Sequence, residues 1–280
     1  MRISGFSFGR NLIELDYPVV ESITSVLPLV DEFIFNLGDS NDETTEVVTS
    51  IPGDKLRFLY SVWNDSLRKD GLVFSHQANL AFQQCNGDWA IFINADEVIH
   101  EKDYDSIMKA IKKSHDRREV LGLMFRYYHF DGDYWSINPW RYHREIRVVR
   151  NDGRVEPCGD MSGFCCVQDK LYLKSGPKER RADSGAYIYH YGWVRKNPRV
   201  MLERNRRLEY YYHDNAYIQE NYGGKEEFDY EYYEALKEFR GEHPAVMKER
   251  ISKAARLRKR RNRWLNPRFY KEVFTHGFKG

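Results

Sequence analysis

The segment that ends in the acids Asp96 and Glu97 is the part of this sequence most able to do chemistry. In the stretch IFINADEVIHE, bulky apolar residues typical of a buried strand run directly into these acids. A carboxylate there must be solvated at the sheet edge, paired with a base or bound to a cation, because an unpaired buried charge costs too much free energy. The alternative, a helix N-terminus that favours acids, suits Glu101 and Asp103 better than it suits Asp96.

Alternating strand and helix patterns in the first half indicate what must position these acids. Apolar residues at helical spacing predict helices over residues 18–27 and 74–85. Short strands are expected at residues 32–37, 55–60 and 89–93. This order predicts an α/β fold with a mixed, mainly parallel sheet flanked by helices. Ligands bind such sheets beyond the carboxyl ends of the strands, so Asp39 and Asp96 should share one edge.

The pattern changes after Val120. An apolar and aromatic run over residues 121–130, a turn at 131–133 and a strand at 145–149 predict an extended hairpin laid against the first half. After about residue 196 the chain becomes helical, rich in tyrosine and highly charged. A cluster of basic residues stands near its end: Arg256, Arg258, Lys259, Arg260, Arg261 and Arg263. A solvated or oligomer-facing helix, or contact with a membrane surface, would each fit this cluster.

Composition narrows the class of protein. The 280 residues are 41% hydrophobic and 31% charged, which is typical of a soluble globular chain. Net charge is only +2, so binding of nucleic acid is not expected of the chain as a whole. No window approaches the length of an apolar membrane span, and residues 1–6 show no export pattern, so neither a membrane span nor export is expected. The four cysteines, with Cys165 and Cys166 adjacent, lack metal spacing and the density of a disulfide scaffold, so a reducing cytoplasm is expected.

Several motifs together resemble the family 2 glycosyltransferases of the GT-A, Rossmann-like fold. They are FGRN, GDSNDET, SHQAN and NGDWAIFINADEV, in this order along the chain. DWAIFINADEVIHE, EIRVVRN and YHYGWVR resemble a bacterial and viral branch of that family. The resemblance implies a nucleotide-sugar-binding and catalytic domain over residues 1–195, followed by a helical, basic C-terminal extension over residues 196–280.

The resemblance implies a metal site at Asp96. In that family an Asp-x-Asp-like motif ends the strand, and its last carboxylate binds a divalent metal that bridges the donor diphosphate. The first acidic position of the motif falls here on Asn94, which supplies no charge. His190 resembles the histidine that many GT-A enzymes bring to the metal, although a packed, hydrogen-bonded side chain is an equal alternative. A mixed oxygen and imidazole set favours Mn²⁺ over Mg²⁺. His100 is a nearer but weaker candidate.

The resemblance also implies an acid that takes the proton of the acceptor hydroxyl. Asp160, flanked by glycines in CGDMSGF, has the expected position, and Glu145 in HREIRVV is its rival. Arg144 and Arg147 make a structural ion pair the other interpretation of Glu145. Residues expected to bind the nucleotide sugar are Phe8, Asn11, Asp39, Trp63, Asn79, Asn94 and Arg195.

The predicted function is therefore metal-dependent, inverting transfer of a sugar from a nucleoside diphosphate sugar to a hydroxyl of a glycan or lipid-linked acceptor. A sugar nucleotide hydrolase or nucleotidyltransferase is an alternative, because both use a similar sheet and metal. GFSFGRN is too poor in glycine and lysine to favour a nucleotidyltransferase. A nucleic-acid-binding protein that uses the basic cluster is the non-enzymatic alternative.

Overall fold

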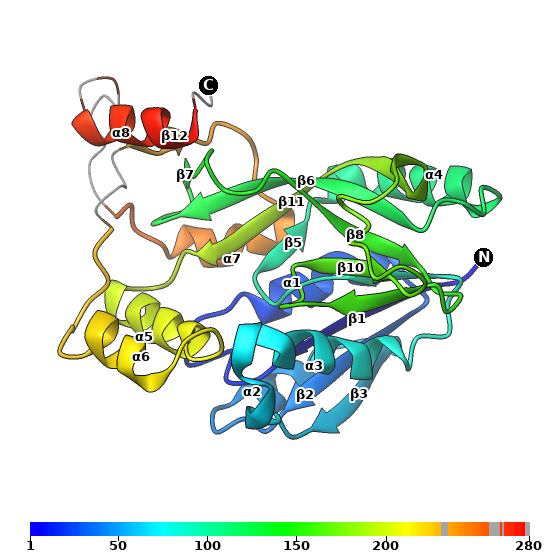
Figure 1. Cartoon of the computed structure of the whole chain (residues 1–280), viewed down its shortest axis with the longest axis horizontal. Coiled ribbons are helices and arrows are strands. Elements are labelled where there is room, and N and C mark those ends of the chain that lie inside the picture. The colour runs from blue at the N-terminus through cyan, green and yellow to red at the C-terminus, as the bar shows by residue number, and fades with distance from the viewer. Residues whose placement is uncertain (231–234, 258–263, 265, 278–280) are drawn as a thin grey trace.

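The computed structural model describes residues 1–230, 235–257, 264 and 266–277 (Figure 1). The strands are β1 (Ile3–Gly9), β2 (Glu32–Gly38), β3 (Leu56–Ser61), β4 (Trp89–Phe92), β5 (Glu97–Ile99), β6 (Gly122–Asp131), β7 (Ser136–Ile137), β8 (Arg144–Arg150), β9 (Val155–Cys158), β10 (Gly163–Cys166), β11 (Arg181–Trp193) and β12 (Lys237–Glu238). The α-helices are α1 (Val19–Val26), α2 (Thr44–Thr49), α3 (Leu72–Phe82), α4 (Tyr104–His115), α5 (Pro198–Glu209), α6 (Asn215–Tyr222), α7 (Lys248–Ser252) and α8 (Pro267–His276).

One large sheet organises the described part of the chain. Its strand order is β12-β7-β6-β8-β4-β1-β2-β3, with β11 paired to β6 and β5 paired to β11. β1 is parallel to β2 and β4, and β2 is parallel to β3. β8 runs antiparallel between β4 and β6, and β6 is parallel to β11. Most strands therefore run in one direction, which confirms the predicted mixed, mainly parallel sheet.

The two faces of this sheet are covered by different elements. Phe33 packs on the face that α1 and α4 cover, whereas its neighbour Ile34 packs on the face covered by α3 and the β9–β10 hairpin (Figure 1). Such alternation follows from the pleat of a strand, which sends successive side chains to opposite faces. Because both faces are covered, β1, β2 and β4 are almost wholly buried, and apolar or small residues make up most of their sequences.

The predicted hairpin over residues 121–149 is present but does not lie on the first half. β6 and β8 pair antiparallel, and β8 also pairs with β4, so both strands extend the main sheet. Trp89 of β4 stands opposite Arg150 of β8. The free edge of β4 offers unpaired backbone groups that β8 satisfies, which explains why sheet extension replaces face packing. The hairpin that does cover a face is β9–β10.

The segment after residue 196 packs α5 against α6 and adds β12 to the sheet edge through β7. Most of the predicted basic cluster falls outside the described residues; within them, the Arg256 guanidinium lies 5.1 Å from the ring centre of Trp135. Among the helices in the described ranges, none has the length and apolar character needed to cross a membrane.

Candidate active site

Pairing of β5 with β11 brings together two residues that are far apart in the sequence. The register sets His190 opposite Glu97, and the Tyr191 amide donates to the Asp96 carbonyl at 2.7 Å. Asp96 follows the end of β4 and is buried, as is His190. The His190 Nε2 atom lies 3.6 Å from Asp96 Oδ1. The acid and the histidine that the sequence proposed as metal ligands are therefore neighbours.

Positive charge surrounds the second oxygen of Asp96. Arg195 Nη2 lies 3.8 Å and Arg204 Nη2 lies 3.9 Å from Asp96 Oδ2, and both arginines are buried. Burial raises the pKa of Asp96, but its interactions with His190, Arg195 and Arg204 lower the pKa by more than burial raises it. The pKa therefore lies well below its ordinary range. Asp96 is therefore an ionised carboxylate at neutral pH, with two buried arginines beside it.

Glu97 holds the backbone around Asp96 in place. Arg147 donates two hydrogen bonds of 2.8 Å to the Glu97 carboxylate, and the Tyr127 hydroxyl donates a third at 2.9 Å. The same carboxylate accepts from the Asn94 amide at 3.3 Å. Charge pairing with Arg147 outweighs burial and lowers the pKa of Glu97. With its oxygens engaged in this way, Glu97 supports the turn that presents Asp96.

A cavity of about 1200 Å³ opens beside Asp96 at the carboxyl edge of the parallel strands. Four aromatic rings form one side of it: Phe8, Trp63, Phe74 and Tyr211. Asp96, His190 and Arg204 also line the cavity and give it charged groups. An aromatic side suits a nucleobase, and a cationic side suits phosphate groups.

The structure brings most, but not all, of the proposed ligand-binding residues to this cavity. Those that line it are Phe8, Asn11, Trp63, Asn94, Asp96, Asp160 and His190. Asp39 reaches the predicted sheet edge but is exposed and accepts bonds from Arg10 and the Trp63 amide. Asn79 lies on α3, outside the lining. Arg195 also lies outside it, because its fully buried side chain packs behind Asp96.

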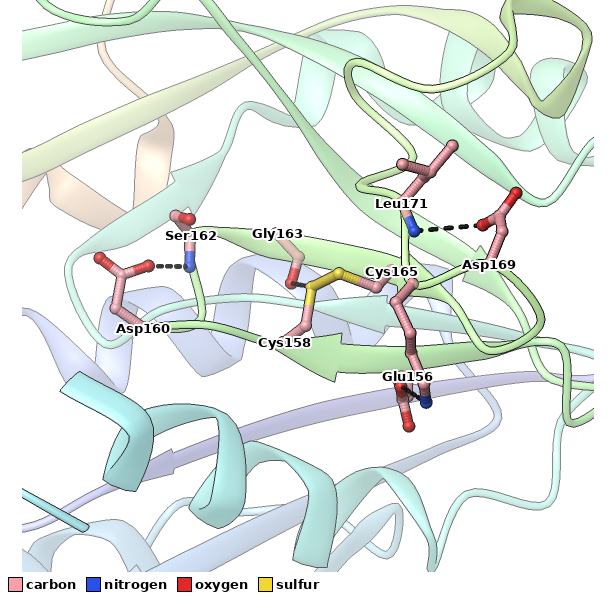
Figure 2. Close-up of a disulfide and its surroundings, with 9 residues drawn as sticks. Glu156, Cys158, Asp160, Ser162, Gly163, Cys165, Asp169 and Leu171 are labelled. Atoms are coloured by element: carbon pink, nitrogen blue, oxygen red, sulfur yellow. Dashed lines mark hydrogen bonds and ion pairs between the residues drawn. A yellow bond between two sulfur atoms is a disulfide. The ribbon is translucent and has the colours of Figure 1, made fainter. Parts of the chain in front are cut away.

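Asp160 stands at the tip of the β9–β10 hairpin, where Figure 2 shows it beside Ser162. Its Oδ1 accepts the Ser162 amide at 3.0 Å, and its Oδ2 accepts the Tyr212 hydroxyl at 3.0 Å. A disulfide between Cys158 and Cys165 joins the two strands below this tip (Figure 2). Spacing alone does not predict this bond, since the two sulfurs meet only once the strands pair.

Glu145, the rival of Asp160, is placed differently. It is buried, and the Lys174 amine donates to it at 2.7 Å. It does not line the cavity. The structural ion pair that the sequence suggested for Glu145 therefore exists with Lys174 as partner, while Arg147 binds Glu97 instead.

His100, the weaker candidate for a metal ligand, caps the short helical turn at Glu101–Asp103 by accepting the Lys102 amide.

The sequence analysis named neither Arg204 nor Tyr212. Arg204 lies on α5, on the same buried face as Met201 and Asn205. An arginine at helical spacing among buried positions was the available signal, because a cation on such a face needs a nearby anion. Tyr212 follows the same helix, and burial, together with the charge of Asp160, raises its pKa. Its hydroxyl therefore keeps its proton and donates to Asp160.

The residues at Asp96 fit a metal ion that is held partly by its substrate. Nowhere in the described residues do three or more acidic, histidine or cysteine side chains form a group able to hold a metal. Gly192 nevertheless leaves open the space beside the pair, since a Cβ on it would lie 2.5 Å from His190 Nε2 and 3.0 Å from Asp96 Oδ2. One carboxylate and one imidazole, completed by phosphate oxygens and water, make a usable set for Mg²⁺ or Mn²⁺.

The fold is an α/β sheet whose cavity lies beyond the carboxyl ends of its parallel strands, which is where sheets of this class bind their ligands. Residues 17–170, more than half of the chain, match the sequence profile of Glycosyl transferase family 2. The chain belongs to this family and is a glycosyltransferase with the expected GT-A architecture.

Comparison with curated protein sequences gave no match. Among solved structures, residues 1–349 of TarS from S. aureus in complex with UDP-GlcNAc align with 79% of this chain and 70% of that chain, at 16% identity and a TM-score of 0.43. Glucosyl-3-phosphoglycerate synthase from Mycobacterium tuberculosis, with Mn²⁺, UDP and glucosyl-3-phosphoglycerate, aligns with 76% of this chain and 81% of that chain, at 12% identity and a TM-score of 0.40. Likenesses this low add nothing to the family membership.

Proposed function

We propose that this glycosyltransferase moves a sugar from a nucleoside diphosphate sugar to a hydroxyl of a glycan or lipid-linked acceptor, with inversion and with a bound divalent cation. One observation carries the proposal: the ionised Asp96 and His190 face each other in the lining of a cavity that also holds a cluster of aromatic rings. The nucleotide and the diphosphate need these two environments at once.

The donor fits this cavity in one orientation. The base would lie against Trp63 and Phe8, whose rings are 6.1 Å apart, and Asn11 and Asn94 offer polar groups for the ribose. The diphosphate would then reach Arg204, which lines the cavity and carries a fixed positive charge. A buried guanidinium binds phosphate oxygens more strongly than an exposed one, because it has fewer competing waters.

Asp96 and His190 would hold the cation, with Mn²⁺ favoured over Mg²⁺ because imidazole is one of the two protein ligands. When bound, such a cation stabilises the negative charge that builds up on a departing diphosphate. Arg195, fully buried behind Asp96, keeps the carboxylate ionised and aligned rather than contacting the substrate.

Asp160 would take the proton of the acceptor hydroxyl. The acceptor oxygen forms a bond to the anomeric carbon, the bond from that carbon to the diphosphate oxygen breaks, and its electron pair leaves with the nucleoside diphosphate. Attack on the side opposite the leaving group inverts the configuration. The hydrogen bond from Tyr212 orients the Asp160 carboxylate, and the amide of Ser162 steadies its other oxygen.

Purified protein with Mn²⁺ tests the proposal against a panel of nucleoside diphosphates and their sugars. UDP, UDP-glucose and UDP-GlcNAc are reasonable first probes. A bound nucleotide should raise the melting temperature, since a ligand that binds only the native state stabilises it. Product analysis then separates transfer, which makes a new glycoside, from hydrolysis, which releases free sugar. Folded protein that binds no nucleotide and turns over no donor would rule the proposal out.

A further inference from the structure

His129 is a buried histidine in direct contact with His190, and none of the steps above uses it. The parallel pairing of β6 with β11 sets the two residues side by side at the same register. Their Nδ1 atoms are 2.8 Å apart, and the rings meet edge to face with centres 4.9 Å apart. Only one proton can lie between two nitrogens at that distance.

The hydrogen-bond partner of His129 Nε2 decides which nitrogen of His129 carries the proton. His129 Nε2 is 2.6 Å from the backbone carbonyl of Tyr142, and a carbonyl only accepts, so Nε2 carries a proton. A second proton on Nδ1 would make this buried ring a cation. The ring is buried among Tyr127, Tyr142 and His190, and these neighbours cannot compensate a positive charge, so the ring is neutral. Its Nδ1 is therefore an acceptor.

It follows that His190 donates from Nδ1 to His129. With that proton fixed, a neutral His190 has its lone pair on Nε2, the nitrogen that faces Asp96 Oδ1 at 3.6 Å. The space beside Nε2 is kept open by Gly192. The opposite tautomer would put an N–H toward Asp96 and would leave two bare nitrogens facing each other, which repel.

We propose that His129 is a positioning residue that fixes the Nδ1–H tautomer of His190 and so presents the Nε2 lone pair, together with Asp96, to a divalent cation. This inference rests on the metal site in the proposed function. The chain of hydrogen bonds begins at the backbone carbonyl of Tyr142, which fixes the proton of His129. His129 in turn fixes the proton of His190. Outer partners of this kind fix the orientation and tautomer of metal-binding histidines.

The rings around His129 keep it from turning. Tyr127 stacks on it with centres 5.2 Å apart and planes 19° apart, and Tyr142 meets it edge-on at 4.4 Å. Tyr127 is itself anchored by its hydroxyl to Glu97. A flipped His129 ring would break the bonds to the Tyr142 carbonyl and to His190 together. The tautomer of His190 is thus built into the folded protein before any metal arrives.

The first test reads the tautomer in protein without metal or nucleotide. Long-range ¹H–¹⁵N NMR, recorded roughly two pH units above the ordinary histidine pKa, distinguishes Nδ1–H from Nε2–H imidazole. The His190 signals are assigned by their absence in His190→Gln. We expect His190 to carry its proton on Nδ1 and His129 to carry its proton on Nε2. A His190 proton on Nε2 overturns the inference even if the protein binds Mn²⁺ well.

The second test measures Mn²⁺ affinity by the electron paramagnetic resonance signal of the free ion, at one fixed concentration of UDP for all variants, because phosphate oxygens complete the site. His129→Phe keeps a ring but removes the acceptor, and it should weaken Mn²⁺ binding by roughly 10- to 100-fold. His129→Asn keeps an acceptor near the position of Nδ1 and should stay within about threefold of the wild type. Equal affinity of wild type and His129→Phe would contradict the inference.

The two experiments separate this inference from the proposed function. Wild-type protein that binds no Mn²⁺ overturns the metal site itself, whereas the tautomer is decided by NMR alone. Should His129→Phe not fold, the wild-type spectrum and the His129→Asn affinity still decide the matter. Loss of Mn²⁺ binding in His129→Asn while His190 keeps its Nδ1–H form would contradict the inference, because affinity would then not follow the tautomer.

Discussion

His190 faces Asp96 across the edge of the sheet, with 3.6 Å between Nε2 and Oδ1. Asp96 directly precedes β5 and His190 lies in β11, and antiparallel pairing of β5 with β11 places the two residues together. An acid ionised by its neighbours and an imidazole at this separation form the chemical centre of the cavity.

Asp96→Asn should remove Mn²⁺-dependent nucleotide binding, because the amide lacks the charge that the cation needs. It also leaves Arg195 and Arg204 near a neutral group, and the free energy of unfolding should fall by about 3 kcal/mol. Thermal-shift assays with and without Mn²⁺ and UDP measure both effects. Asp39→Asn is the matched control, since this exposed carboxylate follows a neighbouring strand outside the cavity. Nucleotide binding that survives Asp96→Asn would refute the assignment.

Asp160→Asn should spare donor binding and lower kcat by about 10²- to 10⁴-fold, because an amide cannot take the acceptor proton. The side chain keeps its size and can still accept from Tyr212. Glu145→Gln is the comparison, and it should lower stability through loss of the Lys174 pair while leaving kcat within a fewfold. Steady-state kinetics with one donor and one acceptor decide between the two. The reverse pattern would make Glu145 the base.

Gly192→Ala should abolish metal binding in a folded protein. The added Cβ would lie 2.5 Å from His190 Nε2, where the cation must approach. Mn²⁺ affinity measures the effect, and circular dichroism and the melting temperature show whether the sheet is retained. Wild-type Mn²⁺ affinity in this variant would place the metal elsewhere.

Loss of the disulfide should loosen the hairpin that carries Asp160. Replacing both cysteines, Cys158→Ser with Cys165→Ser, should lower the free energy of unfolding by about 2 kcal/mol and reduce kcat more than it changes the KM for the donor. Urea titration and kinetics report the two effects. Cys166→Ser is the control, because Cys166 is a free cysteine on the same strand. An unchanged kcat in the double variant would show that the bond does not matter for Asp160.

Stability should fall in mild acid through His243. Burial lowers the pKa of His243 to about 4, so between its unfolded value near 6.5 and about 4 the unfolded chain binds the extra proton. The free energy of unfolding should therefore drop as the pH falls through that range, by up to about 1.4 kcal/mol per pH unit for this group. Urea titrations at successive pH values measure the slope, which should be shallower in His243→Gln. Equal slopes would show that another group is responsible.

Local patterns in the sequence carried the prediction of the sheet. Apolar runs such as residues 89–93 predicted buried strands, and the position of Asp96 after one of them predicted the edge at which a ligand would bind. The same patterns could not show that residues 144–150 extend the main sheet. A strand that joins a sheet and a strand that packs on its face have the same pattern of apolar residues. They differ only in which strand their backbone groups pair with, and for β8 that strand is β4.

By itself, the sequence determined the α/β class, the carboxylate at the strand end and the family, because these depend on local periodicity and on motifs of a few residues. Only the tertiary structure decided which distant side chains meet. It placed Arg204 and His190 beside Asp96, and Tyr212 beside Asp160. Glu145, Asn79 and Arg195 do not line the cavity. The physical reason is that pKa values, tautomers and counter-charges arise from neighbours in space, and strand pairing chooses those neighbours.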